Sequence, residues 1–312
     1  MSRHPNTSAP VANASSSPDA SVSRRSFFAA GGAAALGAAA LATVAPAAAQ
    51  QAKPGESLLD VWTRTKKARI GVDLNNKPLR FKDESGKPAG LGIDFLELLL
   101  KDIGAEPVYT EMPFGQTFAA LSAGKFDMIG TFVTILPGRA LRGAFAGFPA
   151  YYQQNVAYLK AGKKLQSLND LNAPGTQIAC QQGTSEETTL RAMFPKAEIQ
   201  TFPQMADATS AVGTGRVDAL ITDALFAANV FKAFPDVTVH PETVNAIPNT
   251  FFMAADDFKL WAYITNWLRY QGSLRTMLGL QQKWFGTEAQ DKYGVPIVAV
   301  GSGGEPLVIK KS

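Results

Sequence analysis

The stretch that decides the fold is KFDMIGTFVTILPGR, which occupies residues 125–139. The apolar run at 126–133 is typical of a buried strand, and it is followed by Thr134 and, after a Pro-Gly turn, by Arg139. The second half of the chain contains a related phrase, GRVDALITD, at residues 215–223. Each phrase leads from the end of a predicted helix, through an aspartate, into a predicted strand.

Strands and helices alternate along the rest of the chain. Strands are predicted at 68–74, 107–111, 126–133, 156–160, 177–181, 198–202, 217–222, 237–240 and 251–254. Helices are predicted at 94–103, 117–123, 139–143, 185–194, 205–214, 223–234, 260–279 and 280–285, and residues 51–66 form a polar stretch before the first strand. This alternation favours an α/β fold with mostly parallel sheets flanked by helices.

Composition and charge narrow the classes of function. Apolar residues make up 46% of the 312 residues, and the net charge is +4. Three of the 30 basic and one of the 26 acidic residues lie in 1–49, which leaves 27 and 25, a net charge of +2. No clustered basic face points to a nucleic-acid partner, so we expect a small-molecule ligand.

Cysteine and histidine are scarce. Cys180 is the single cysteine, so no intrachain disulfide is possible, and its apolar strand predicts a small core residue. Beyond residue 49 the one histidine is His240, next to a proline at a predicted strand end. A zinc site needs three or four ligands, and a Ser-His-Asp triad needs a positioned histidine. We therefore expect no metal, no cofactor and no catalytic residue.

Residues 1–49 are predicted to be an export signal. The Arg24-Arg25 pair precedes an Ala/Gly-rich stretch at 29–44, and small residues follow up to Ala49. Basic region, apolar region and small-residue cleavage site come in the order of a secretory signal. The arginine pair and the weakly apolar stretch indicate the twin-arginine route, cleavage after Ala49 and a periplasmic location. A membrane anchor at 29–44 is the alternative.

Polar residues follow several of the predicted strands. Asp73, Thr134, the pair Gly183-Thr184 and the pair Thr222-Asp223 each stand at a strand end. In open α/β sheets, ligands bind in the crevice beyond the carboxyl ends of the strands. One ligand site built from these four ends is the economical interpretation.

Over residues 66–288 the chain resembles the periplasmic amino-acid-binding proteins of ABC importers, which have the type II two-lobe fold. The resemblance is carried by these motifs: Lys125-Phe126-Asp127, Thr134 with Arg139, Gln182-Gly183-Thr184, Gly215 to Ala219, Thr222-Asp223, and Lys283 to Glu288. It implies one lobe from 57–150 plus 255–300 and a second from 154–250, with two crossing strands near 151–156 and 248–254 as the hinge. Residues 301–312, with Gly301–Gly304, are expected to form a flexible tail.

The resemblance also implies roles for polar residues. Arg139 is expected to bind the ligand α-carboxylate through paired hydrogen bonds, with a surface arginine as the alternative. Thr134 adds a contact from the same lobe, and Gly183-Thr184 meets the carboxylate at a helix N-terminus. Asp223 is expected to pair with the α-ammonium group. For Thr184 and Asp223, plain helix capping is the alternative.

Five further residues complete the predicted ligand-binding set. Phe114 matches an aromatic that packs on the ligand, with a core position as its alternative. Asp73 is expected to contact the ligand side chain, and Gln181 matches a position that tunes side-chain choice. Phe132 and Asn76 are assigned to the same set.

The chain departs from the family pattern near the first strand. Asn76 stands where an aromatic is common, and Arg80 stands where an acidic residue is common. The motif Gly-Phe-Asp before the first long helix is Gly90-Leu91-Gly92 here. We therefore expect one wall of the pocket to be more polar than usual, which disfavours a large apolar ligand.

Three functions are compared. The first is capture of an amino acid or similar zwitterion by a monomer that delivers it to a membrane permease of an ABC importer. The second is a dehydratase of the same fold acting on prephenate or arogenate, which needs a carboxylic acid to protonate a leaving hydroxyl. Such an acid is expected soon after Asp223, but residues 224–228 are all apolar, so capture is favoured. The third is a sensor module for a membrane receptor, which needs a membrane span or a fused output domain, and we expect neither; a detached binding protein that docks on such a receptor is the remaining form of this alternative.

Overall fold

The computed structural model describes residues 55–285 and 297–309, so the predicted export signal lies outside the described residues. The helices are α1 (Leu58–Thr65), α2 (Leu91–Ile103), α3 (Phe114–Ser122), α4 (Pro137–Ala140), α5 (Ser185–Met193), α6 (Met205–Gly213), α7 (Ala227–Ala233), α8 (Phe258–Ser273) and α9 (Thr276–Phe285), with 3₁₀ turns η2 (Leu168–Asn172) and η3 (Ala224–Phe226). The strands are β1 (Lys67–Val72), β2 (Asn75–Asn76), β3 (Arg80–Lys82), β4 (Pro88–Ala89), β5 (Glu106–Glu111), β6 (Met128–Thr134), β7 (Ala144–Phe145), β8 (Tyr151–Leu159), β9 (Gln177–Gln181), β10 (Glu198–Phe202), β11 (Ala219–Asp223), β12 (Thr238–Met253), β13 (Ile297–Val300) and β14 (Pro306–Ile309).

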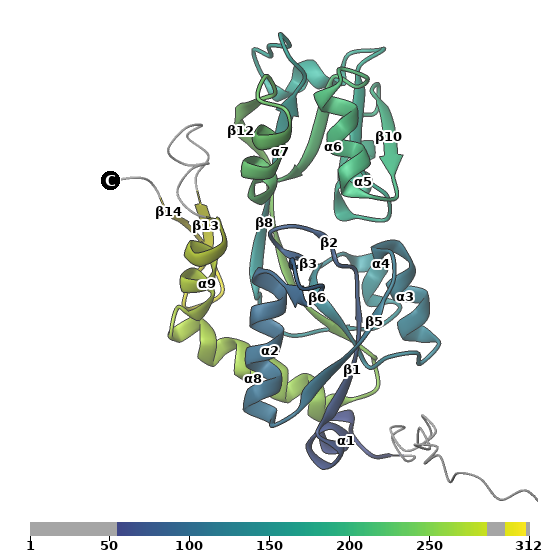
Figure 1. The fold of residues 1–312 in the computed structure, drawn as a ribbon, viewed down its shortest axis with the longest axis vertical. Helices are drawn as coiled ribbons and strands as arrows, with labels where there is room; N and C mark the ends of the chain where they lie inside the picture. Colours follow the sequence, from purple (N-terminus) through teal and green to yellow (C-terminus); the bar gives the residue numbers. More distant parts are fainter. Residues whose placement is uncertain (1–54, 286–296, 310–312) are drawn as a thin grey trace, which may run out of the picture. The chain divides into compact units, whose positions relative to one another are not determined.

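One sheet runs through the described chain. Its strand order is β10-β9-β11-β8-β12-β6-β1-β5, with β7 paired to β12. Strand β1 is parallel to β5 and β6, and β9 is parallel to β10 and β11. We call the part with β1, β5, β6 and β7 the first half of the sheet and the part with β9, β10 and β11 the second half. In Figure 1, α1, α2 and α3 surround the first half and α5, α6 and α7 the second. The expected mostly parallel α/β fold is confirmed.

The antiparallel pair β8 and β12 joins the two halves. Their register runs from Tyr151 opposite Asn249 to Leu159 opposite Thr238. Separate strands at 237–240 and 251–254 were expected, and this is wrong, because β12 is one strand of 16 residues. Pro241 and Pro248 argue against a continuous strand in the sequence. The strand tolerates Pro241 because the register with β8 shifts between Val239 and Thr243, and proline is accepted at such irregularities.

The two related phrases of the sequence have the same structural task. The Asp127 carboxylate is 2% exposed and accepts from the Arg69 backbone N–H at 3.3 Å, at the start of β1. In the second half, Asp218 accepts from the Gln177 backbone N–H at 2.9 Å, at the start of β9. Asp127, which precedes β6, thereby fixes the partner strand β1. Asp218, which precedes β11, fixes the partner strand β9 in the same way. Asp127 also accepts from the indole of Trp62 at 2.8 Å, which ties α1 to the sheet.

Helix boundaries follow local sequence. Helix α2 buries the expected apolar face, and Gly104 ends it in the left-handed conformation at φ 75°. The helix predicted over 260–279 is wrong in its extent. Arg275 takes φ 55°, and this break separates α8 from α9. The polar stretch before the first strand contains α1, capped by Ser57.

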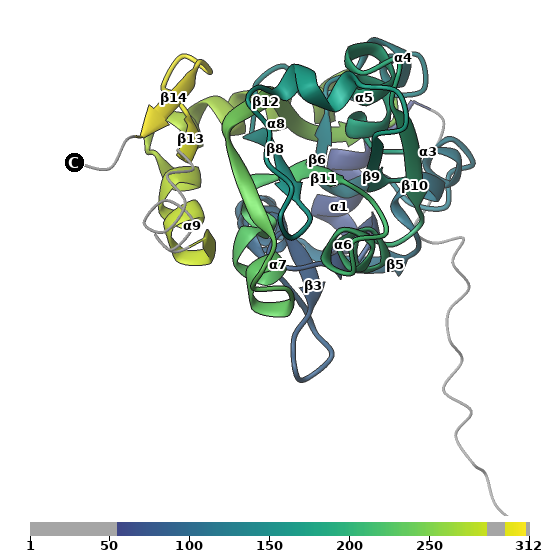
Figure 2. The ribbon, with the colours of Figure 1, turned by 90° about the horizontal axis from the view of Figure 1, so that it is seen from above.

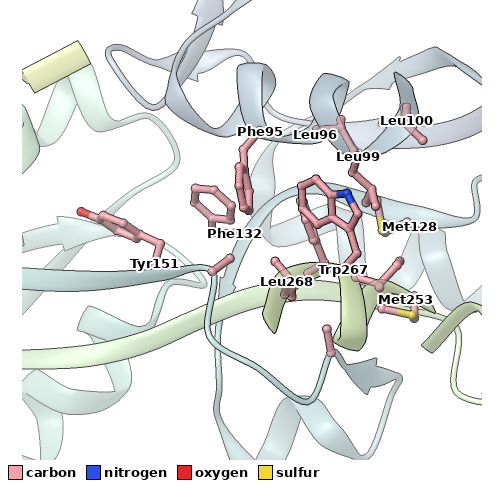
Figure 3. Packing of buried hydrophobic residues seen from close by; sticks show 14 of the residues in the cluster. Phe95, Leu96, Leu99, Leu100, Met128, Phe132, Tyr151, Met253, Trp267 and Leu268 are labelled. Carbon is pink, nitrogen blue, oxygen red and sulfur yellow. The ribbon is translucent and has the colours of Figure 1, made fainter. Parts of the chain in front are cut away.

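The core of the first half is built on aromatic side chains. Phe95 of α2 lies 5.8 Å from Phe132, 6.0 Å from Phe251 and 5.0 Å from Trp267, measured between ring centroids. Phe132 in turn stacks on Tyr151 of β8 at 5.7 Å. Figure 3 shows the rings of Trp267, Phe95, Phe132 and Tyr151 in this order. This row of rings connects the core to the polar groups described below.

A C-terminal hairpin lies against the strand pair. Strands β13 and β14 are antiparallel, and Figures 1 and 2 both place β13 beside α9. The hydroxyl of Tyr152, on β8, donates to the Gly304 carbonyl at 2.7 Å. Residues 301–309 of the segment expected to be a flexible tail take part in this hairpin, and residues 310–312 lie outside the described residues. The glycines form the hairpin turn, and the following Pro306–Ile309 run forms its second strand.

Candidate functional site

A cavity of about 50 Å³ lies where the ends of β6, β9 and β11 meet β2, β3 and the strand pair. Its walls are Asn76, Leu79, Arg80, Phe114, Phe132, Thr134, Arg139, Tyr151, Gln153, Gln181, Thr184, Ser185, Glu186, Met205, Thr222, Asp223, Phe226 and Asn249. Eight of the ten residues assigned from the sequence are among them. The two that are not are Asp73 and Gly183.

Arg139 contacts both halves of the sheet. It lies in the short helix α4, after β6, and its Nη1 donates to the Thr134 carbonyl at 3.1 Å. Its Nη2 donates to the Gly183 carbonyl at 3.0 Å, across from the second half. The guanidinium lies over the rings of Phe118 and Phe114, at 5.0 and 5.6 Å from their centroids. Burial lowers the pKa of Arg139 to about 10, so it remains charged at neutral pH. These two hydrogen bonds to carbonyl oxygens use two of the five N–H donors of the guanidinium and leave the other three for further hydrogen bonds.

Asp223 ends β11 and is 3% exposed. Its Oδ1 accepts from the Leu225 N–H at 3.1 Å, so the capping alternative is present. Its Oδ2 accepts from the Tyr151 hydroxyl at 2.6 Å. Burial raises the pKa of Asp223 to about 8, although the Tyr151 hydrogen bond works in the opposite direction. A cationic group beside this carboxyl would lower that pKa again.

Glu186 is a site residue that the sequence analysis did not identify. It stands in the first turn of α5, is 4% exposed and accepts from the Ser185 hydroxyl at 3.0 Å. Its charge contributes to the raised pKa of Asp223 and partly opposes the fall in the pKa of Arg139. An acidic residue in a first helical turn is ordinary, because it complements the helix dipole. The sequence therefore carries no signal that this side chain points into a cavity.

Arg80 was noted as a departure from the family pattern but was not assigned to the site. It lies on β3, is 5% exposed, and its guanidinium stands 5.3 Å from the Phe114 centroid. Its Nη2 lies 3.7 Å from Asp73 Oδ2. The Asn76 amide accepts from the same nitrogen at 2.7 Å when its oxygen is turned toward Arg80. Burial lowers the pKa of Arg80, and among the described residues its Nε has no hydrogen-bond partner.

Asp73 therefore lies behind Arg80 and does not line the cavity. It is 1% exposed, and its Oδ1 accepts from the Asn75 backbone and side-chain N–H groups at 3.1 and 3.0 Å. Asp73 was expected to contact a ligand side chain, but Arg80 lines the cavity at this place and Asp73 does not. Asn76 and Arg80 both line the cavity on this side, so this wall is polar as expected.

A hydroxyl cluster joins the two halves at the cavity. Thr134 Oγ1 lies 3.0 Å from Ser185 Oγ, and 2.9 Å from Asn249 Oδ1 on β12. Further out, the Asn229 amide donates to the Lys77 carbonyl at 2.7 Å, again between the two halves. The Thr222 hydroxyl lines the cavity and has no partner in the described part of the chain.

The N-terminus of α5 adds backbone groups. Thr184 precedes the helix without capping it, since its hydroxyl donates to the Gln181 carbonyl at 2.7 Å. Gly183 takes φ +73°, and an added Cβ would lie 3.2 Å from Gly115 Cα. The Gly183 N–H donates to Glu187 at 3.1 Å. Gly183 thus shapes the turn and stands outside the cavity wall.

Within the ranges 55–285 and 297–309, no group of three or more His, Cys, Asp or Glu side chains is placed to hold a metal ion. Cys180 is fully buried, and burial raises the pKa of its thiol to about 12. Within the same ranges, none of the helices combines the length and apolarity needed to span a bilayer.

The chain is similar in sequence to known proteins. The sequence pattern of the bacterial extracellular solute-binding proteins, family 3, matches residues 68–287. A probable histidine-binding protein of Campylobacter jejuni is 31% identical over 178 residues, covering 56% of this chain and 67% of that protein. A cyclohexadienyl dehydratase of Pseudomonas aeruginosa is 23% identical over 245 residues, covering 73% and 88%.

Solved structures share the fold. An ancestral amino acid-binding protein, described as a precursor of cyclohexadienyl dehydratase, is 32% identical with a TM-score of 0.67, covering 73% of this chain and all of that one, 100%. An ancestral arginine-binding protein bound to arginine is 26% identical with a TM-score of 0.65, covering 71% and 99%.

Proposed function

Because the chain belongs to the bacterial extracellular solute-binding proteins, family 3, we propose that it captures an amino acid in the cavity and delivers it to an ABC importer. Relatives named as amino-acid-binding proteins support this proposal. The ligand is an α-amino acid or a similar zwitterion, and the protein acts as a monomer that docks on a membrane permease.

One observation carries the proposal: Arg139 and Asp223 line the same cavity from opposite halves of the sheet. A guanidinium with free donors suits a carboxylate, and a buried carboxyl suits an ammonium group. A zwitterion presents one of each at a fixed separation. The unpartnered Thr222 hydroxyl and the N-terminus of α5 supply further donors.

Closure around the ligand is part of the proposal. The predicted lobes, 57–150 plus 255–300 and 154–250, would move about the β8–β12 pair. The hydrogen bonds between Arg139 and Gly183, Thr134 and Ser185, and Asn229 and Lys77, which are present in the structure, would hold the closed form. Water is then excluded from the charge pairs, which strengthens them. The permease would recognise the closed form.

We place the protein in the periplasm, in line with the family it belongs to. The Arg24-Arg25 pair and the following Ala/Gly-rich stretch support export by the twin-arginine route. Replacing both arginines with lysine and following the protein in periplasmic and cytoplasmic fractions tests the route. Unchanged export would contradict it.

A ligand screen tests the binding proposal. The purified protein is unfolded and refolded to strip bound solute, and its melting temperature is measured with each common amino acid. At a ligand concentration of 100 Kd, binding adds about 2.7 kcal/mol to the free energy of unfolding. We expect an upward shift with one class of amino acid that is lost in Arg139→Ala and Asp223→Ala. No shift with any α-amino acid would overturn the proposal.

A dehydratase is the second candidate, and Glu186 is the observation that favours it. A buried carboxylic acid lines the cavity after all, although not at the expected position after Asp223. If protonated, it would donate its proton to a leaving hydroxyl of prephenate or arogenate, which departs as water while carboxylate leaves as CO2. Incubation with each compound and measurement of the aromatic product decides between the candidates. Turnover that Glu186→Gln abolishes would favour the enzyme.

A further inference from the structure

The charged groups of the cavity can be paired one by one. Asp73 faces Arg80, with 3.7 Å between Oδ2 and Nη2. In the proposed function, Arg139 takes the ligand carboxylate and Asp223 the ligand ammonium. These three pairings neutralise every charged group that lines or backs the cavity except Glu186.

Glu186 is buried without a counter-ion. The residue is 4% exposed, and among the described residues its carboxylate accepts one hydrogen bond, from the neutral Ser185 hydroxyl at 3.0 Å. It forms no ion pair with any lysine, arginine or histidine in the described part of the chain. A buried carboxylate is costly unless a cation or a proton neutralises it.

The two arginines of the cavity do not supply that cation. Both attract Glu186 at longer range, and this attraction partly opposes the lowering of their pKa values by burial. Arg80, however, is held by Asp73 and by the Asn76 amide, and Arg139 is held by two backbone carbonyls. With the ligand's carboxylate and ammonium in place, the cavity keeps one net negative charge.

We infer that Glu186 is the counter-ion of a positively charged ligand side chain, so that the preferred ligand is a cationic amino acid. This inference rests on the proposed function. A neutral side chain would leave the charge uncompensated, and an acidic one would add a second. Met205 and Phe226, which line the same cavity, provide apolar surface for the methylene stem that such side chains have.

The test compares ligands that differ in charge but hardly in shape. Dissociation constants are measured by calorimetry at neutral pH for arginine and citrulline, for lysine and norleucine, and for glutamate. We expect each cation to bind at least about tenfold more tightly than its neutral partner, since hydrogen bonds to charged groups are the strong ones. Glutamate should bind most weakly.

Two variants complete the test. Glu186→Gln should bring the arginine to citrulline ratio close to one while citrulline affinity stays within a few-fold. Glu187→Gln, the matched control on the same helix, should keep the ratio, because its side chain is outside the cavity wall. An unchanged ratio in Glu186→Gln, or neutral ligands that bind the unaltered protein as tightly as cations, would overturn the inference and leave amino-acid capture standing. If no α-amino acid binds the unaltered protein, both fail. The ligand series alone decides if Glu186→Gln does not fold.

Discussion

Ligand binding should release a proton from Asp223. Burial raises the pKa of this carboxyl to about 8 in the ligand-free cavity, with Glu186 adding to the rise and the Tyr151 hydroxyl opposing it. An ammonium ligand needs the ionised form. Below pH 8 the free protein holds the proton, and binding must expel it. Affinity should therefore fall as the pH falls.

The magnitude follows from the pKa. With a value of about 8, the carboxyl is about half ionised at pH 8 and about 1% ionised at pH 6. The dissociation constant should then rise about 50-fold between these pH values, which corresponds to about 2 kcal/mol of binding free energy. At pH 7, calorimetry in buffers of different ionisation enthalpy should detect release of close to one proton per ligand.

Two variants sharpen the measurement. Asp223→Asn cannot titrate, so its weakened binding should lose the pH dependence. Tyr151→Phe removes the hydroxyl that donates to Oδ2 at 2.6 Å, so the pKa should rise and the pH dependence should extend to higher pH. An affinity that is constant from pH 6 to pH 8, without proton release, would refute the reasoning.

Three further predictions concern stability and kinetics. The folded pKa of Asp223 lies above the unfolded value of 3.8, so the contribution of this carboxyl to stability is complete below pH 3.8 and is lost as the pH rises through about 8. Between pH 5 and pH 9, the melting temperature of ligand-free Asp223→Asn should therefore fall by several degrees less than that of the unaltered protein. Equal falls in melting temperature would contradict this prediction. Gly183→Ala should lower the free energy of unfolding by about 1–2 kcal/mol in urea titrations, because φ is +73° and the new Cβ meets Gly115 at 3.2 Å; an unchanged midpoint would show that the turn adapts. Asn229→Ala removes the amide that donates to the Lys77 carbonyl at 2.7 Å, so the ligand dissociation rate in stopped-flow mixing should rise about 2- to 10-fold, and an unaltered rate would mean that this bond does not hold the closed form.

The regular strands of the chain could be predicted from the sequence because burial and length set them. The predicted strands 177–181 and 198–202 coincide with β9 and β10. Strand β12 could not be predicted as one element, because its prolines mark a strand end in local reasoning, and only the pairing with β8 makes them acceptable. The break at Arg275 likewise has no local signal, since arginine rarely takes a positive φ.

Some residues of the site could likewise be predicted from the sequence and others could not. Residues at strand ends, such as Thr134 and Asp223, could be predicted to meet because parallel strands bring their carboxyl ends to one edge. Glu186 and Arg80 could not be placed by that argument. Glu186 is one of two adjacent acids in a first helical turn, and tertiary packing alone decides which of them enters the cavity. Arg80 depends on the small sheet β2-β3-β4, whose strands are only two or three residues long.

The hydrogen bond between Tyr152 and Gly304 has a consequence for shortened variants of the protein. Tyr152 belongs to the strand pair that joins the two halves, and its partner lies 152 residues further along the chain, in the hairpin of β13 and β14. A variant without residues 297–309 would contain every cavity-lining residue and yet lack this contact. Such a truncation would therefore act on the strand pair and leave the composition of the cavity wall unchanged.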